Sequence, residues 1–213
     1  MNKINCRLCD SLSPEFYRDP RTQQTYHHCP ECDLRFLDPA QYLSYEQEEE
    51  RYRQHNNIAE DPAYQKFTQP VIDVICRRPP PLEILDFGCG DGPVIPHLLK
   101  NTGYEVAVYD PYFRPDSSVL ERKYDVVAVV EVAEHLYYPQ KVFTQIRAML
   151  KAGGQLVVMT ELVGDNIDFG SWYYRKDPTH VCLFSQRTQK WIAANLGFSL
   201  VTFESSRLTV FSL

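Results

Sequence analysis

The feature that most constrains the fold is an alternation of short apolar segments with helix-like segments from residue 82 onward. The apolar segments read EILDF, YEVAVYD, YDVVAVV and QLVVMTEL, and amphipathic stretches separate them. Strands that alternate with helices in this way form a parallel sheet covered by helices. After a last helix over residues 186–196, the segments GFSLVTFES and RLTVFSL lie too close together for a helical crossover and must pair antiparallel. The sequence predicts a doubly wound α/β fold with a C-terminal antiparallel hairpin.

The first of these strands runs into a glycine-rich turn, DFGCGDG at residues 86–92. Glycines allow a sharp turn and a close approach of the backbone to a nucleoside at the carboxyl edge of the sheet. The third glycine comes one position too early for the dinucleotide fingerprint, and Pro93 stands at the expected site, which disfavours a dehydrogenase. A plain tight turn is the simpler interpretation. Asp110, at the end of the second strand, favours a ligand because its carboxylate is placed to accept hydrogen bonds from ribose hydroxyls.

The connection that follows Asp110 is unusually short. Fourteen residues or so separate it from the next strand at Tyr124, about the minimum for one parallel crossover. We therefore expect the usual third strand of such a sheet to be reduced or missing.

Two cysteine pairs mark the N-terminal segment. Cys6-x-x-Cys9 and Cys29-x-x-Cys32 are separated by nineteen residues. Four thiolates at this spacing can bind a tetrahedral Zn²⁺, and metal binding would stabilise a segment too small for a core of its own. Two disulfides or a redox pair are the alternatives, and a reducing cytosol and the absence of a strand-helix pattern disfavour them. We expect a structural zinc ribbon.

The remaining histidine and cysteine residues near this motif and elsewhere are given no ligand role. His27 and His28 are expected at the surface, because four cysteines already complete the site. Cys76, Cys89 and Cys182 stand alone and are expected to behave as small buried apolar residues.

Charge argues against a nucleic-acid partner. The chain has 22 Lys and Arg against 28 Asp and Glu, and residues 1–38 carry five basic against six acidic side chains. A phosphate-binding surface is therefore disfavoured. The longest aliphatic run, residues 126–130, is much shorter than the roughly 20 residues of a membrane span, and the start MNKINCRLCD has no apolar signal core. We expect a soluble cytoplasmic protein; oligomeric state cannot be deduced.

Composition divides the chain into three parts: a zinc-ribbon module at 1–38, a helical linker or cap at 39–81, and an α/β domain at 82–213. The middle part predicts helices broken near Pro62 and Pro70, with the acidic run at 46–50 on a solvated face. The rigid segment RRPPP at residues 77–81 ends this middle part.

The segments ILDFGCGDG, VYDPYF, YDVVAVVEVAEHL and WYYRKDPTHVCLFS resemble class I S-adenosylmethionine-dependent methyltransferases, which have a Rossmann-like sheet. With the four cysteines, they resemble a bacterial group that carries an N-terminal zinc ribbon. The resemblance implies that Asp86 and residues 88–92 line the methionine end of the cofactor and that Asp110 holds the ribose. The implied cofactor-binding set is Asp86, Gly88, Cys89, Gly90, Gly92, Asp110, Pro111, Tyr112 and Glu131. The family's adenine-binding acid has no clear counterpart; Tyr112 and Phe113 either stack on adenine or simply pack.

A candidate chemical centre follows the strand YDVVAVV. A helical turn there would place Glu131, Glu134 and His135 on one side of the ligand crevice, and His180 of the DPTH segment could join them. Either His135 is the general base, or the four groups hold a divalent ion that lowers the pKa of the acceptor. The second arrangement resembles plant small-RNA 2′-O-methyltransferases and ubiquinone-pathway O-methyltransferases. In the structural alternative, Glu134 caps a helix and the histidines bond only the backbone.

Three functions are compatible with these observations: methylation of a small molecule, methylation of RNA that the ribbon binds, and a methyltransferase-like protein that binds a ligand without turnover. Acidic charge favours the first, and the glycine turn with Asp110 disfavours the third. Aromatic and basic residues in the loop from Asp165 to Ser185 form either an acceptor pocket wall or a packed sheet edge. These aromatic and basic residues are Phe169, Trp172, Tyr173, Tyr174, Arg175 and Lys176.

Overall fold

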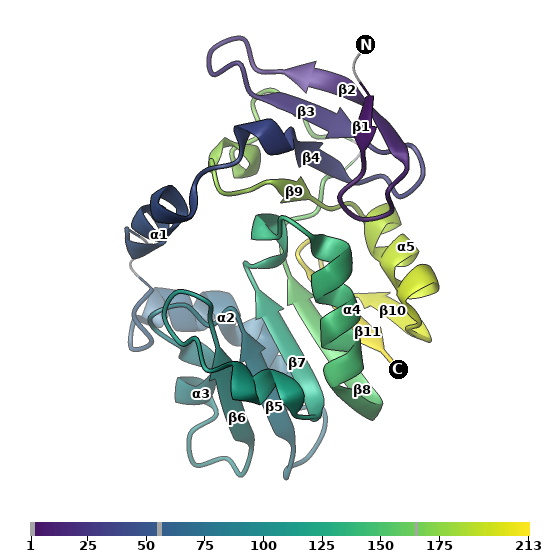
Figure 1. Ribbon diagram of the computed structural model, residues 1–213. Helices are drawn as coiled ribbons and strands as arrows, with labels where there is room; N and C mark the ends of the chain where they lie inside the picture. The colour runs from purple at the N-terminus through teal and green to yellow at the C-terminus, as the bar shows by residue number, and fades with distance from the viewer. Residues whose placement is uncertain (1–2, 55–56, 165) are drawn as a thin grey trace.

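The computed structural model describes residues 3–54, 57–164 and 166–213. These residues form two sheets, and the smaller sheet lies beyond one end of the larger one (Figure 1). The larger sheet has the strand order β10-β11-β8-β7-β5-β6. Its strands are β5 (Glu83–Phe87), β6 (Glu105–Tyr109), β7 (Tyr124–Val130), β8 (Leu150–Met159), β10 (Leu200–Phe203) and β11 (Leu208–Ser212). β6, β5, β7 and β8 are parallel, whereas β11 pairs antiparallel with both β8 and β10. The predicted C-terminal hairpin is confirmed.

Helices cover both faces of this sheet. One face packs against α2 (Pro62–Ile75) and α3 (Val94–Leu98), and the other packs against α4 (Pro139–Met149) and α5 (Gln186–Leu196). Neighbouring residues of a strand point to opposite faces. Ile84 therefore belongs to the apolar core under α2 and α3, and Leu85 belongs to the core under α4 and α5. This arrangement confirms the doubly wound α/β fold that the sequence predicts.

The third strand of the sheet is missing, as the short connection predicts. Residues 110–123 contain only a turn and the 3-10 helix η2 (Ser117–Glu121) between β6 and β7. β6 is therefore the edge of the sheet, and the carboxyl ends of β6, β5 and β7 lie side by side without a further strand beyond them.

The smaller sheet has the order β1-β2-β3-β4-β9. Its strands are β1 (Lys3–Asn5), β2 (Leu12–Arg18), β3 (Thr25–His28), β4 (Arg35–Leu37) and β9 (Cys182–Leu183). The first four are N-terminal, whereas β9 follows β8 and pairs with β4 through Arg35–Leu183 and Phe36–Cys182. The ribbon segment therefore shares a sheet and an apolar core with the α/β part of the chain.

The segment between the two sheets forms η1 (Pro39–Gln41), α1 (Tyr45–Arg53) and α2. The predicted break near Pro62 is present, because Asp61 caps the start of α2, but Pro70 lies inside that helix and does not break it. The prediction at Pro70 is wrong because its proline ring is accommodated within one continuous helix. Figure 1 shows α1 standing above the carboxyl edge of the large sheet. The other short elements are η3 (Ala133–His135) and η4 (Tyr174–Lys176).

β8 begins at Leu150 and is longer than the apolar segment QLVVMTEL suggests. One expectation for the lone cysteines is wrong. Cys76 is exposed, because it follows the last turn of α2, whereas Cys89 and Cys182 are buried as expected. Among the described residues, the structure contains no helix that is both long and apolar enough to span a membrane.

Candidate active site

The glycine turn after β5 has the backbone geometry that its sequence predicts. Gly88 and Gly90 have φ values of 79° and 65°, which favour glycine over residues with a side chain. A Cβ on Gly88 would also lie 2.4 Å from Cγ2 of Val132. The turn therefore requires glycine both for its conformation and for its contact with the segment after β7.

Asp110, directly after β6, is hydrogen-bonded to this turn. Its carboxylate accepts hydrogen bonds from the backbone N–H of Gly90 at 3.0 Å, Tyr112 at 2.8 Å and Phe113 at 3.1 Å. Burial and the nearby charge of Asp110 raise the pKa of Asp86 to about 7. The two carboxylates and the glycine turn thus form one anionic corner at the carboxyl edge of the sheet.

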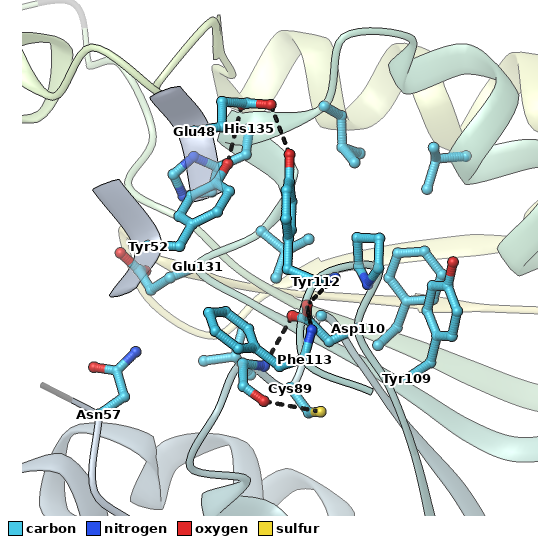
Figure 2. A pocket seen from close by; sticks show the side chains of 18 of the residues that line it. Glu48, Tyr52, Asn57, Cys89, Tyr109, Asp110, Tyr112, Phe113, Glu131 and His135 are labelled. Carbon is cyan, nitrogen blue, oxygen red and sulfur yellow. Dashed lines mark hydrogen bonds between the residues drawn. The ribbon is translucent and has the colours of Figure 1, made fainter. Parts of the chain in front are cut away.

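A cavity of about 680 Å³ opens from this corner (Figure 2). The predicted residues that line it are Gly88, Cys89, Gly90, Asp110, Pro111, Tyr112, Glu131, His135 and His180. Asp86, Gly92 and Glu134 do not line it. Asp86 is only 4% exposed, Glu134 is fully buried, and Gly92 lies under the backbone of Asn57, whose oxygen would be 1.8 Å from an added Cβ.

Helix α1 forms the roof of the cavity. Glu48 and Tyr52 face the cavity from α1, and the Tyr112 hydroxyl donates to Oε2 of Glu48 at 2.9 Å. The ring of Tyr112 stacks on Tyr45 with centroids 4.7 Å apart. Tyr112 therefore packs against α1 and also lines the cavity, and its stacking on adenine stays a prediction. The prediction of a fully solvated acidic face is wrong at Glu48, which is 7% exposed.

The segment after β7 carries a network of buried acidic and hydroxyl groups. Glu134 Oε1 accepts from the Tyr174 hydroxyl at 2.5 Å, and Glu134 Oε2 accepts from Thr160 at 2.8 Å. The same Tyr174 oxygen lies 3.3 Å from Oε2 of Glu131. Glu134 therefore binds two side chains of the segment that follows β8, rather than capping a helix.

Glu131 is held in an unusual conformation at the end of β7. Its φ is 51°, a region that non-glycine residues rarely adopt, and its buried Oε1 has no hydrogen-bond partner among the described residues. Burial and the charge of Glu134 raise the pKa of Glu131 to about 8. This oxygen has only an ion pair with Arg207 at 3.9 Å, and a strained backbone with an oxygen that lacks a hydrogen bond at the cavity wall is typical of a ligand-binding position.

His135 and His180 meet beside Glu134. Nδ1 of His135 lies 3.0 Å from the carbonyl of Thr179, and Nδ1 of His180 lies 2.6 Å from the carbonyl of Tyr174. Because a carbonyl only accepts, both Nδ1 atoms carry a proton, which leaves Nε2 as the ring nitrogen of each histidine that faces the other groups of the cluster. Burial and the neighbouring His135 lower the pKa of His180 to about 4, so that it is neutral at pH 7.

These three side chains have the geometry of a metal-binding group. One ligand atom each from Glu134, His135 and His180 lies within 4.8 Å of the others, whereas Glu131 is outside this set. Anchoring of Nδ1 to a backbone carbonyl is the usual second contact of a metal-binding imidazole. Two imidazoles and a carboxylate suit Zn²⁺ or Mn²⁺, and a site that takes in further oxygen ligands suits Mg²⁺.

The four N-terminal cysteines also converge. Sγ of Cys6 lies 3.5 Å from Sγ of Cys32, and Sγ of Cys9 lies 3.3 Å from Sγ of Cys29. All four lie within 4.8 Å of one another, which could hold a tetrahedral Zn²⁺.

The two cysteine pairs have matching turns, because Asp10 and Asp33, each four residues after the first cysteine of its pair, both have φ of 64°. His28 is half-buried, whereas His27 is buried and lies 3.2 Å from Asp38, which corrects its expected surface position. It packs inward because β3 is a central strand of the ribbon sheet.

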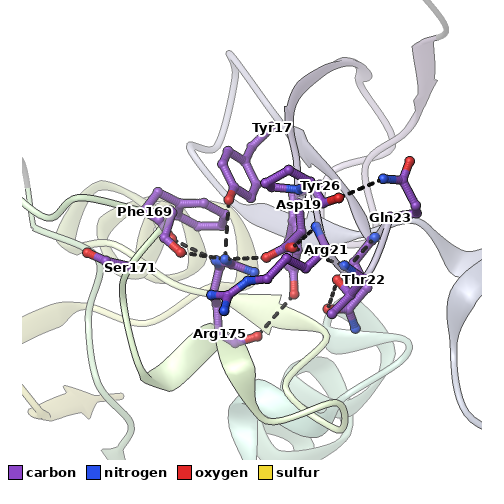
Figure 3. Close-up of polar contacts among 12 residues, drawn as sticks. Tyr17, Asp19, Arg21, Thr22, Gln23, Tyr26, Phe169, Ser171 and Arg175 are labelled. Carbon is purple, nitrogen blue, oxygen red and sulfur yellow. Dashed lines mark hydrogen bonds and ion pairs between the residues drawn. The ribbon is translucent and has the colours of Figure 1, made fainter.

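The loop after β8 packs against the ribbon sheet (Figure 3). Arg175, which is 2% exposed, pairs with Asp19 at 2.7 Å and donates to the carbonyl of Phe169 at 2.7 Å. Phe169 contacts the rings of Tyr17 and Tyr26 edge to face. The interpretation of Phe169 and Trp172 as an acceptor pocket wall is therefore wrong: Trp172 is buried and neither residue lines the cavity. Asp165 lies outside the described residues.

The sequence reasoning missed Glu48 and Tyr52. The pattern Tyr45, Glu48, Tyr52 places two aromatic rings and one acid on a single face of α1. An acid at the centre of an aromatic helical face is the feature that could have identified the roof of the cavity.

Comparison with known proteins identifies a family. A family model described as a methyltransferase domain matches residues 51–202. No curated protein sequence matches the chain.

Solved structures with a similar fold include a SAM-dependent methyltransferase from Archaeoglobus fulgidus, with 22% identity, a TM-score of 0.51 and coverage of 75% of this chain and 76% of that chain. A 1,6-didemethyltoxoflavin-N1-methyltransferase from Burkholderia thailandensis, with 1,6-didemethyltoxoflavin and S-adenosylhomocysteine bound, has 13% identity, a TM-score of 0.50 and coverage of 93% and 97%. An O-methyltransferase family protein from the same organism has 15% identity, a TM-score of 0.51 and coverage of 78% of this chain. The chain spans 61% of the length of that protein and 56% of a structure from Nostoc punctiforme.

Proposed function

The chain belongs to the methyltransferase-domain family, and we propose that it is a class I S-adenosylmethionine-dependent methyltransferase whose acceptor is a small molecule bound in the cavity under α1. One observation carries this proposal. A single cavity extends from the glycine turn and Asp110 to His135 and His180, with α1 as its roof. Its volume of about 680 Å³ is in the range of small-molecule sites and leaves room for an acceptor beside the cofactor.

The proposed binding of the cofactor uses the corner between β5 and β6. The carboxylate of Asp110 would accept from the ribose hydroxyls, and Gly88 and Gly90 would let the backbone approach the methionine portion. Asp86, buried under the turn, would favour the cationic methionine end by its charge. The cofactor supplies an electrophilic methyl group when bound.

The proposed acceptor chemistry uses the other end of the cavity. His135 has its imidazole oriented by the Thr179 carbonyl, and its Nε2 would take the proton of an acceptor hydroxyl or amine. Glu134 and the neutral His180 stand beside it. A divalent ion held by these three side chains would instead lower the pKa of an acceptor hydroxyl. Whether His135 acts as a base or the three side chains hold an ion, the residues that line the cavity would orient the acceptor.

The proposal is tested by incubating the protein with S-adenosylmethionine that carries a labelled methyl group and with fractionated cell extract, and by measuring the label transferred to each fraction. We expect label in a fraction of molecules below about 1 kDa, and a loss of at least about a hundredfold in the His135→Ala variant. If a chelator leaves the wild-type rate intact while His135→Ala is inactive, His135 acts as a base without metal. Label found only in RNA, with salt-dependent retention of the protein on RNA, would contradict the proposal.

A further inference from the structure

The roof of the cavity contains a buried carboxylate surrounded by tyrosines, which we call the Glu48 cage: Glu48, Tyr52, Tyr112 and Tyr137. We propose that the Glu48 cage binds a protonated amine or quaternary ammonium group of the acceptor. This inference rests on the proposed function and names the class of acceptor that the same cavity takes.

Hydrogen bonds hold the carboxylate of Glu48 in place without using all of its acceptor capacity. Oε1 accepts from the Tyr52 hydroxyl at 3.2 Å and Oε2 accepts from the Tyr112 hydroxyl at 2.9 Å (Figure 2). An ionised carboxylate offers about four acceptor positions. Glu48 lines the cavity, so we assign its remaining acceptor capacity to a ligand N–H there.

No positive charge balances this carboxylate within the described part of the chain. Glu48 is 7% exposed and forms no ion pair there, whereas the nearby Arg51 pairs with Asp177 at 2.6 Å and Arg53 pairs with Glu49 at 2.7 Å. An unpaired buried carboxylate is costly, and burial raises the pKa of Glu48 accordingly. A cationic ligand would remove this cost because it supplies the missing charge.

The rest of the cavity favours a cation as well. Its described lining includes four acidic side chains and a single basic one, Lys141, so that an anionic acceptor would be repelled. The rings of Tyr52, Tyr112 and Tyr137 line the same end of the cavity. Tyrosine faces attract ammonium groups, and several faces around one carboxylate bind them more strongly than either element alone.

The Glu48 cage is close to the proposed chemical centre. The ring of Tyr52 meets the ring of His135 edge to face with centroids 5.3 Å apart. An ammonium group held by Glu48 therefore lies about one aromatic ring away from His135, which leaves another atom of the same molecule next to that imidazole. The cage acts in recognition, and the methylated atom is a separate one.

Three matched probes test the charge of the ligand. Protein saturated with S-adenosylhomocysteine is titrated with tyramine, 4-ethylphenol and 4-hydroxyphenylacetate, which differ in carrying a positive, no or a negative charge. Binding is followed by saturation-transfer NMR. We expect tyramine to bind at least tenfold more tightly than the other two, and Glu48→Gln to weaken tyramine at least tenfold. Glu50→Gln, a change at an exposed acid of the same helix, should leave tyramine binding unchanged.

The outcomes separate this inference from the proposed function. Equal or tighter binding of the neutral or anionic probe, unchanged tyramine binding in Glu48→Gln, or no tyramine binding at millimolar concentration would each overturn it. In these cases binding of S-adenosylhomocysteine would still support the methyltransferase site. Unfolding temperatures of both variants show that Glu48→Gln acts on the ligand and not on folding, because glutamine keeps an oxygen that accepts from the tyrosines.

Discussion

Asp86 illustrates how one buried side chain links pH to ligand binding. Its carboxyl is 4% exposed, and burial together with Asp110 raises its pKa to about 7. An ordinary aspartate has a pKa of about 3.9, so the folded protein binds a proton that the unfolded chain releases between these values. The free energy of unfolding therefore falls as the pH rises from about 4 to about 7, because the charged form is disfavoured only in the folded protein.

The first prediction concerns this group. A cationic cofactor near Asp86 favours the charged carboxylate, so the affinity for S-adenosylmethionine should rise several-fold between pH 5.5 and 7. Asp86→Asn should abolish this pH dependence, since the amide does not titrate. Calorimetric titrations at several pH values measure the effect. A pH profile identical in wild type and Asp86→Asn would show that Asp86 does not sense the cofactor.

Individual residues also show where reasoning from sequence fails. The four cysteines, the glycine turn and Asp110 could be located because their chemistry depends on local spacing. Arg175 could not, because the residues that bury it come from a distant part of the chain: it pairs with Asp19, 156 positions earlier.

At the scale of elements, the sheet and its order follow from the sequence pattern. Four parallel strands, the short connection before β7 and the antiparallel hairpin all have local signatures in apolar segments and loop lengths. The pairing of β9 with β4 has none, since each partner is three residues or shorter. That pairing joins the ribbon to the loop that carries His180, and only the tertiary structure reveals it.

The second prediction concerns the contact between this loop and the ribbon. Arg175→Met would leave the buried carboxylate of Asp19 without its counter-charge and should lower the unfolding temperature by at least about 4 °C. The exposed Arg18→Met should change it little, because surface pairs contribute little. Thermal unfolding measures both variants. Equal unfolding temperatures of Arg175→Met and Arg18→Met would contradict the role given to Arg175.

The same contact should weaken in acid. Hydrogen bonds from the backbone of Thr22 and from Arg175 hold the pKa of Asp19 well below its usual range. Its contribution to stability is therefore complete at neutral pH and is lost as the pH falls below the ordinary aspartate value of about 3.9.

At the scale of the whole molecule, the ribbon and the α/β part share one apolar core. The ribbon also contacts two residues of the cavity wall, because Arg7 donates to the carbonyl of Tyr137 at 3.1 Å and lies over the ring of Tyr138. The sequence boundaries at 38 and 81 therefore separate segments that pack as a continuous structure. We propose that the cysteine cluster holds zinc and thereby supports the cavity.

The third prediction tests this proposal. Elemental analysis should find about one zinc per chain, and Cys29→Ser should release it and destabilise the ribbon. Cys76→Ser is the matched control, since Cys76 is exposed and distant in sequence from the cluster. Wild-type protein that is folded and free of zinc, or a Cys29→Ser variant that keeps its metal, would refute the zinc site.

The central claim is that the corner between β5 and β6 binds the cofactor, and calorimetry with S-adenosylhomocysteine tests it most directly. Wild-type protein should bind one molecule per chain. Asp110→Ala should lose charge-assisted hydrogen bonds of about 1.5 to 3 kcal/mol, which weakens binding about 10- to 100-fold. Asp110→Asn keeps an acceptor for the turn and separates lost charge from a disturbed backbone. No binding by the wild type, or equal affinity in all three proteins, would contradict the account.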